Sequence, residues 1–427
     1  MHTVVTADDE RRTAALAVRG TALLLVIGAI ATGAVACGED RKQRAAMTPV
    51  ARASPTRQDL MAEKHTLGRE LPLGRMTSVA GGGAELGDGG AATSAGFCGA
   101  GDVALDQRGN LYISDFGEEC EGPGAGTVRK VDTRGIITTV AGGTGVLGFG
   151  GDGGPATKAQ LSSPSAIAVS PDGELYVADQ DNFRIRKVDA KGMITTVAGT
   201  GEQGHSGDGG PARAAQLAEV SGLAFDARGN LYVAEFAAVR KLDRSGSIST
   251  VAGTGKFDGY TTADDVPLRL HSAGDGGAAT KAKLTPTDVA VDRLGALYVS
   301  DFHTGLVHKV DRDGIIRTVA GSRAATRVGK HGPATSSRLI DPWGVTVDDQ
   351  GNVFIAEHHG ERFRKAVSDG MMTTIAGTGV PGFSGNSGRA AKMKLHDPGH
   401  LTVDGHGLLY ITDYFNHRVW AVRYRDP

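Results

Sequence analysis

The sequence predicts an all-β protein: a six-bladed β-propeller of four-stranded antiparallel blades, closed by an N-terminal strand that pairs into the last blade. One observation is a phrase, Gly-x-(Leu/Val)-(Tyr/Phe)-x-x-(Asp/Glu), that occurs six times in the 427 residues. It begins at Gly109, Gly173, Gly229, Gly295, Gly351 and Gly407, so neighbouring copies lie 56 to 66 residues apart. A nearly constant period of this size indicates one supersecondary unit copied in a closed or stacked array. The other observation is that the repeat region begins with the last strand of a unit and ends with the first three.

The repeated unit contains four short apolar runs, which the second copy shows most clearly. They span residues 165–169, 175–178, 184–188 and 193–198, with turn residues between them. Short runs joined by tight turns predict one antiparallel blade. The first run is the most apolar, which predicts a position nearest the central axis. The third run alternates charged and apolar residues, which is typical of a strand nearer solvent.

The two ends of the repeat region predict a closed ring. Residues 75–81 match only the fourth run of a unit. The chain ends with residues 401–403, 409–412 and 418–422, which match only the first three runs. We therefore expect the N-terminal strand to complete the last blade, because closure removes the exposed edges that an open array would leave.

A second repeated phrase, Gly-Asp-Gly-Gly-(Pro/Ala)-Ala, lies between the units at residues 151–156, 207–212 and 274–279. It predicts a glycine turn followed by one helical turn, because Pro favours the first helical position. Its aspartate is also compatible with calcium. Calcium needs about six oxygen ligands, and each phrase offers a single carboxylate, so a structural role is the favoured interpretation.

These phrases resemble those of bacterial NHL-repeat six-bladed propellers, whose blades read Pro-x-Gly-(Val/Ile)-Ala-Val-Asp, Gly-Asn-Leu-Tyr-Val-Ala-Asp, Asn-x-Arg-Ile-Arg-Lys-Val and Ile-Thr-Thr-Val-Ala-Gly-Thr-Gly. The chain is also similar to the NHL region of teneurins, and the resemblance covers about residues 75–425. It implies the propeller fold. It leaves function open, because NHL propellers serve as binding platforms for proteins, RNA or carbohydrate, while related propellers are lyases or lactonases.

The N-terminal part of the chain differs in composition from the repeats. Residues 1–36 combine an arginine-containing start with an apolar stretch at 21–36, which predicts a signal peptide. Small residues directly before Cys37 resemble a bacterial lipobox and predict lipidation of Cys37, with plain secretion as the alternative. Residues 37–74 lack periodicity and predict a flexible tether. The propeller is expected over residues 75–427.

Composition limits the partners. The chain is 40% hydrophobic, contains 64 glycines and has a net charge of −2, so no basic excess points to nucleic acid. We expect a monomer that reaches a membrane only through a lipid anchor. Cys98 and Cys120 lie in two connections that emerge on one face of blade one, which in an oxidising compartment predicts a disulfide. Free thiols or half of a metal site are the alternatives.

An acidic residue ends every second strand. The six acids are Asp115, Asp179, Glu235, Asp301, Glu357 and Asp413. A set that is present in every blade predicts a scaffolding role, with each carboxylate accepting hydrogen bonds from the turn that follows it.

Breaks in the symmetry supply the candidate site. By resemblance, the first strand carries a small residue two positions after proline, and three blades replace it with Asp102, Asp288 and His400. We expect these side chains at the mouth of a hydrated central channel, with Asp102 and Asp288 in opposite blades. The other candidates, expected on the same face, are His303, Trp343, His358, His359 and, in a long loop at 256–265, Tyr260.

Two functions are compatible with this pattern. The first is a non-catalytic binding platform at the cell envelope, which recognises a protein or a glycan through one propeller face and needs no cofactor. The alternative is a metal-assisted lyase or lactonase, in which Asp102, Asp288 and His400 would hold a divalent metal near the axis. The sequence contains no nucleophile-plus-base motif, phosphate loop or zinc-type cysteine spacing.

Overall fold

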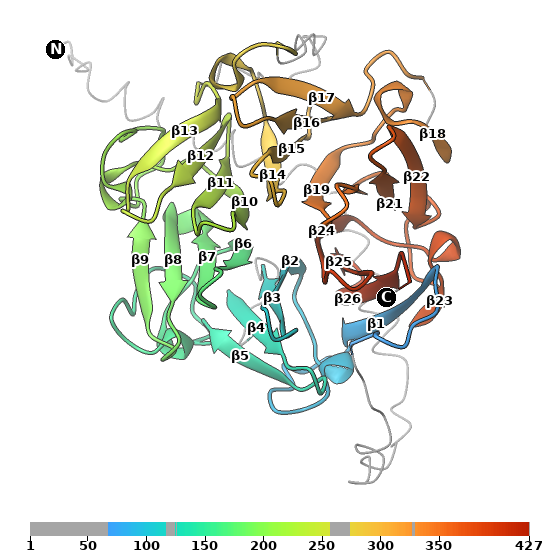
Figure 1. Cartoon of the computed structure of the whole chain (residues 1–427). Helices are drawn as coiled ribbons and strands as arrows, with labels where there is room; N and C mark the ends of the chain where they lie inside the picture. Colours follow the sequence, from blue (N-terminus) through green and yellow to red (C-terminus); the bar gives the residue numbers. More distant parts are fainter. Residues whose placement is uncertain (1–66, 117–123, 125, 257–273, 327–328, 427) are drawn as a thin grey trace, which may run out of the picture. The chain divides into compact units, whose positions relative to one another are not determined.

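The computed structural model describes residues 67–116, 124, 126–256, 274–326 and 329–426. These residues form six antiparallel sheets around one centre, which confirms the predicted six-bladed propeller (Figure 1). In every blade each strand is hydrogen-bonded to the strand beside it, and the first strand lies nearest the centre. Within the described part of the chain, no helix has the length and hydrophobicity of a membrane span.

The strands of each blade follow the predicted runs closely. Blade one contains β2 (Ala100–Leu105), β3 (Leu111–Asp115), β4 (Thr127–Val131) and β5 (Ile137–Ala141). Blade two contains β6 (Pro164–Val169), β7 (Leu175–Asp179), β8 (Arg184–Val188) and β9 (Ile194–Ala198). Blade three contains β10 (Val220–Phe225), β11 (Leu231–Glu235), β12 (Ala238–Leu242) and β13 (Ile248–Gly253). Blade four contains β14 (Pro286–Val291), β15 (Leu297–Asp301), β16 (Leu306–Val310) and β17 (Ile316–Ala320).

The last two blades each gain a short fifth strand from the segment between blades. Blade five contains β19 (Pro342–Val347), β20 (Val353–Glu357), β21 (Arg362–Ala366), β22 (Met371–Ala376) and the added β18 (His331–Pro333). Blade six contains β24 (Pro398–Val403), β25 (Leu408–Asp413), β26 (Arg418–Arg423), β1 (Arg75–Gly81) and the added β23 (Ser387–Arg389).

Ring closure occurs as predicted, through pairing of the N-terminal β1 with β26. The antiparallel register runs from Met76 opposite Val422 to Gly81 opposite Arg418, with a bulge near Ser78. In Figure 1 the blue β1 lies beside the red strands of blade six. The fold therefore joins the first and last strands of the repeat region within one sheet.

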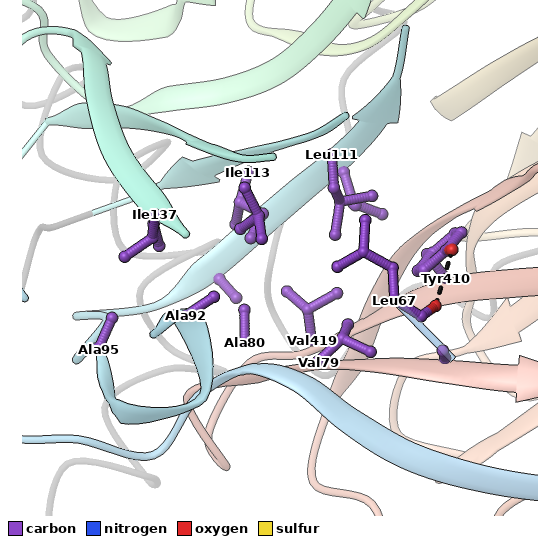
Figure 2. Close-up of a cluster of buried hydrophobic side chains, with 14 of the residues drawn as sticks. Leu67, Val79, Ala80, Ala92, Ala95, Leu111, Ile113, Ile137, Tyr410 and Val419 are labelled. Carbon is purple, nitrogen blue, oxygen red and sulfur yellow. Dashed lines mark hydrogen bonds between the residues drawn. The ribbon is translucent and has the colours of Figure 1, made fainter. Parts of the chain in front are cut away.

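Residues 67–74, which lie within the predicted tether, pack against blade six. Leu67 is buried, and its carbonyl oxygen accepts a hydrogen bond of 2.9 Å from the hydroxyl of Tyr410. Figure 2 shows this pair within a cluster of buried side chains that also includes Val79 of β1 and Ile113 of blade one. The packed part of the chain therefore includes residues before the predicted start of the propeller.

The segments between blades form the predicted turn and short helix. The six 3-10 helices in these segments are η1 (Ala92–Ser94), η2 (Ala156–Lys158), η4 (Ala212–Ala214), η5 (Ala279–Lys281), η6 (Ala334–Ser336) and η7 (Ala390–Lys392), while η3 (Gln180–Asn182) lies in a turn of blade two. The carboxylate of Asp152, in the turn before η2, accepts hydrogen bonds from Arg186 and from the backbone N–H of Thr196. These contacts give this aspartate the structural role that the sequence favoured.

The expectation that the third strand exposes its charges is wrong for its central arginine. Arg186 has no exposed side-chain area and binds the carboxylates of Asp179 at 3.0 Å and Asp152 at 2.7 Å. The equivalent arginines of three other blades are buried in the same way, and they are Arg129, Arg240 and Arg364. The physical reason is that neighbouring blades cover both faces of each sheet, so alternation along a strand does not separate a wet face from a dry one.

Candidate functional site

Five aromatic and imidazole side chains of blades four and five gather on the face that carries the turns between second and third strands. We call this cluster, Phe302, His303, Trp343, His358 and His359, the aromatic face. The ring of Phe302 lies 5.5 Å from Trp343, and Trp343 lies 5.1 Å from His358. His303 and His359 are exposed, and the other three side chains are half-buried. The face is therefore a continuous set of rings that solvent reaches.

The two histidines of blade five are held by fixed acceptors. Nδ1 of His359 lies 2.8 Å from a carboxylate oxygen of Asp341, and Nδ1 of His358 lies 3.3 Å from the carbonyl oxygen of Pro398. Both acceptors lack a proton to give, so Nδ1 is the donor in each ring. Burial lowers the pKa of His358, whereas the hydrogen bond that His359 donates to Asp341 raises the pKa of His359. The two neighbouring rings thus differ in their tendency to carry charge.

Asp397, at the entrance to β24, brings an acid from blade six to these histidines. One ligand atom from each of His358, His359 and Asp397 lies within 4.8 Å of the others. Among the described residues, this is the group of three or more His, Cys, Asp or Glu side chains with such spacing. The backbone N–H of Asp397 donates to the carboxylate of Glu361 at 2.9 Å. Burial and the charge of Asp397 raise the pKa of Glu361.

The three symmetry-breaking residues of the first strands meet at the centre of the ring. Nδ1 of His400 lies 3.6 Å from an oxygen of Asp102 and 3.5 Å from an oxygen of Asp288. Asp102, Asp288 and His400 are buried, with only 6%, 6% and 5% of their surface exposed. Their place at the mouth of a hydrated channel stays a prediction.

Both central carboxylates are also used by the scaffold. Asp102 accepts a hydrogen bond of 2.8 Å from the backbone N–H of Ile167 in blade two. Asp288 accepts one of 2.9 Å from Val345 in blade five. Each aspartate thereby links its own first strand to that of the next blade. Burial raises the pKa of Asp102 to about 6, and the two carboxylates outweigh burial to raise the pKa of His400 to about 9.

The structure separates the predicted site residues into two groups. His303, Trp343, His358 and His359 belong to the aromatic face, and Asp102, Asp288 and His400 belong to the centre. Tyr260, Cys37 and Cys120 lie outside the described residues. The role of Tyr260 in ligand binding, the lipidation of Cys37 and the disulfide between Cys98 and Cys120 therefore stay predictions. The metal set Asp102, Asp288 and His400 also stays a prediction, with Nδ1 of His400 at 3.6 Å and 3.5 Å from the two carboxylates.

Sequence reasoning missed Phe302, Asp341 and Asp397 as members of the site. The two aspartates occupy one repeated position, directly before the proline that opens a first strand. Both adopt a left-handed backbone conformation, with φ of 46° and 52°, which aspartate tolerates better than most residues. The Asp-Pro pairs in blades five and six could therefore have pointed to these two aspartates, because blade two has Ser163 at the equivalent position.

A hollow lies on the opposite face of the ring from the aromatic face, between blades four and five. It has a volume of about 520 Å³, and Leu294, Tyr298, Lys309 and Asp348 contribute to its lining. The amine of Lys309 donates a hydrogen bond of 2.8 Å to the hydroxyl of Tyr298. Leu294 is 62% exposed at its rim, which makes this surface a useful comparison with the aromatic face.

The chain is similar to known NHL-repeat proteins. A family model of the teneurin NHL domain matches residues 147–203, 198–264 and 260–328. Teneurin-1 of Gallus gallus is 30% identical in an alignment of 298 residues, which covers 60% of this chain and 10% of that protein. Teneurin-3 of Mus musculus is 28% identical over 362 residues, covering 76% of this chain and 12% of that protein. The chain thus spans about a tenth of the length of these relatives.

Solved structures share the fold. An auxiliary nutrient binding protein from Bacteroides thetaiotaomicron superimposes with a TM-score of 0.57 and 14% identity, over 81% of this chain and 75% of that one. At this level of identity the likeness concerns the fold alone. Together, the six repeated blades, the closure through β1 and the teneurin NHL matches identify this chain as an NHL-repeat six-bladed β-propeller protein.

Proposed function

We propose that the protein is a non-catalytic binding platform that recognises a protein or a glycan through the aromatic face. The observation that carries this proposal is the set of five rings, of which His303 and His359 are exposed and Trp343 is half-buried. Aromatic side chains offer large, rigid contact areas at a low cost in conformational entropy, and they are enriched in recognition surfaces. The rings stand on turns of a closed scaffold, so little ordering is needed on binding.

The setting of this function is the cell envelope or the extracellular space. Support comes from the predicted signal peptide and from relatives and fold neighbours that include teneurins and an auxiliary nutrient binding protein. We propose that Cys37 carries a lipid and that residues 38–66 hold the propeller away from the membrane. We also propose the disulfide between Cys98 and Cys120, which peptide mapping without reductant would detect.

Tryptophan fluorescence offers a direct test of the aromatic face. The chain has two tryptophans, and Trp420 is fully buried while Trp343 lies in the aromatic face. A panel of soluble oligosaccharides and purified envelope proteins is titrated against the protein. A ligand on this face should change the Trp343 emission and saturate.

Matched variants make this test specific. Phe302→Ala should weaken binding by about tenfold, because the loss of one aromatic side chain of moderate importance at an interface has about this effect on affinity. Leu294→Ala, on the opposite face, should leave it unchanged. A ligand that binds both variants alike, or that is lost with Leu294→Ala, would contradict the assignment of the face.

The alternative, a metal-assisted lyase or lactonase at the centre, receives less support. Its candidate residues Asp102, Asp288 and His400 are 5–6% exposed, and the two carboxylates bind backbone N–H groups of neighbouring blades. A substrate would have to displace those contacts to reach a metal there.

A further inference from the structure

We propose that His358, His359 and Asp397 form a binding site for one first-row transition metal ion of the Zn²⁺ type, at the boundary of blades five and six. The site differs from the central residues that the sequence suggested, and it does not depend on the proposed binding function. Imidazole nitrogen and carboxylate oxygen are the ligands that suit zinc, cobalt, nickel and copper ions.

The spacing of the three side chains fits a small ion. Their ligand atoms lie within 4.8 Å of one another. Bonds of about 2.0–2.1 Å in a tetrahedron place ligand atoms roughly 3.4 Å apart, so side-chain rotations of modest size complete the site. The histidines come from the turn after β20 and the aspartate from the entrance to β24, so the ion would join two blades.

The hydrogen bonds behind the histidines match those of metal ligands. Nδ1 of His359 donates to the carboxylate of Asp341, and Nδ1 of His358 donates to the carbonyl of Pro398. In a neutral imidazole the lone pair then stands on Nε2. Metal-bound histidines characteristically donate their other N–H to a carboxylate or a backbone carbonyl, which fixes the tautomer and the orientation of the ring.

The acid is held as firmly as the histidines. Asp397 is 8% exposed, its backbone is fixed at a φ of 52°, and its N–H donates to Glu361. His359 by contrast is exposed. Three protein ligands with one side open to solvent leave a coordination position for water or for a group of a bound partner.

The test uses protein prepared without a histidine tag and treated with a chelator, which is titrated with Co²⁺ and then with Zn²⁺. We expect about one equivalent of Co²⁺ with a visible d–d band, and displacement by Zn²⁺. The band should lack the sulfur-to-cobalt charge transfer that any of the three cysteines would add. An unaltered spectrum and no heat of binding would overturn the proposal.

Variants locate the ion. His359→Ala and Asp397→Asn should each weaken metal binding by tenfold or more. Asn tolerates the left-handed backbone of position 397, and the thermal unfolding of this variant should match that of the parent without metal. His303→Ala is the control on the same surface and should bind as the parent does. Equal affinity of the Asp397→Asn variant and the parent would overturn the site.

Phe302→Ala should keep metal binding, so failure of this proposal and failure of the binding platform are distinguishable.

Discussion

The indole nitrogen of Trp343 lies 3.1 Å from Nε2 of His400, and this hydrogen bond connects the aromatic face to the buried centre of the ring. An indole N–H can only donate, so Nε2 must accept and the ring proton must stand on Nδ1. That nitrogen points to Asp102 and Asp288, at 3.6 Å and 3.5 Å. A second proton on the ring would occupy Nε2. The hydrogen bond from Trp343 and a charged His400 therefore exclude each other.

The first prediction is that pH controls this hydrogen bond. Two buried carboxylates favour the imidazolium by more than the roughly 1 kcal/mol of one neutral hydrogen bond, and they raise the pKa of His400 to about 9. We expect the Trp343 bond to form only as pH rises through about 9, with a change in tryptophan emission. Trp420 donates to Asp413, whose pKa burial raises to about 7, so a change in Trp420 emission should come at a lower pH. His400→Gln should abolish the transition, and its persistence with the same midpoint would show that another group causes it.

The second prediction concerns stability at the same residue. The folded pKa of His400, about 9, lies above its ordinary value of 6.5. Its contribution to stability should therefore be fully present below pH 6.5 and disappear as pH rises to about 9. The size is on the order of 3 kcal/mol. Urea unfolding of the parent and of His400→Gln, at pH 6 and pH 9.5, measures it as a difference that shrinks with pH. A difference that grows with pH would contradict the sign.

The third prediction compares two blades. Arg186 binds Asp179, whose side chain is fully buried, so Arg186→Met should cost about 3–5 kcal/mol by leaving a buried charge unpaired. Blade four has His308 at this position, where Nε2 lies 3.6 Å from Asp301. Among the described residues, neither Nε2 of His308 nor Oδ2 of Asp301 has a hydrogen-bond partner.

We therefore expect His308→Met to lower the free energy of unfolding by less than about 1.5 kcal/mol. Guanidinium unfolding of both variants provides the comparison. Equal losses would mean that the histidine forms an ion pair as strong as that of the arginine.

Local sequence patterns encode strands and turns but not the way in which two blades meet, and this limits what the sequence can predict. Strand runs, turns and the matching ends repeat along the chain, so they predicted six blades and their closure. The proximity of His359 to Asp397, whose ligand atoms lie within 4.8 Å of each other, depends on how two blades meet, which no local pattern contains. The small residue of blade three shows the same limit. A Cβ on Gly222 would lie 2.6 Å from an oxygen of Asp288 in blade four, so the glycine of one blade makes room for the aspartate of the next.

The last prediction concerns the segment before β1. Tyr410 donates to the carbonyl of Leu67, and the guanidinium of Arg423 donates to the carbonyls of Arg69 and Leu71. Tyr410 and Arg423 are 2% and 3% exposed. A protein that starts at residue 75 should therefore leave buried donors unsatisfied and lose about 2–5 kcal/mol relative to one that starts at residue 64.

A protein that starts at residue 82 lacks β1 as well, which leaves β26 as an open edge. We expect that protein to aggregate, because an unpaired edge strand offers free N–H and C=O groups to other chains. Guanidinium unfolding measures the first loss, and light scattering after size exclusion measures the second. If the start at residue 75 were as stable as the start at residue 64, the segment from Leu67 to Gly74 would be a passive tether. If the start at residue 82 stayed monomeric, the ring would hold together without its closing strand.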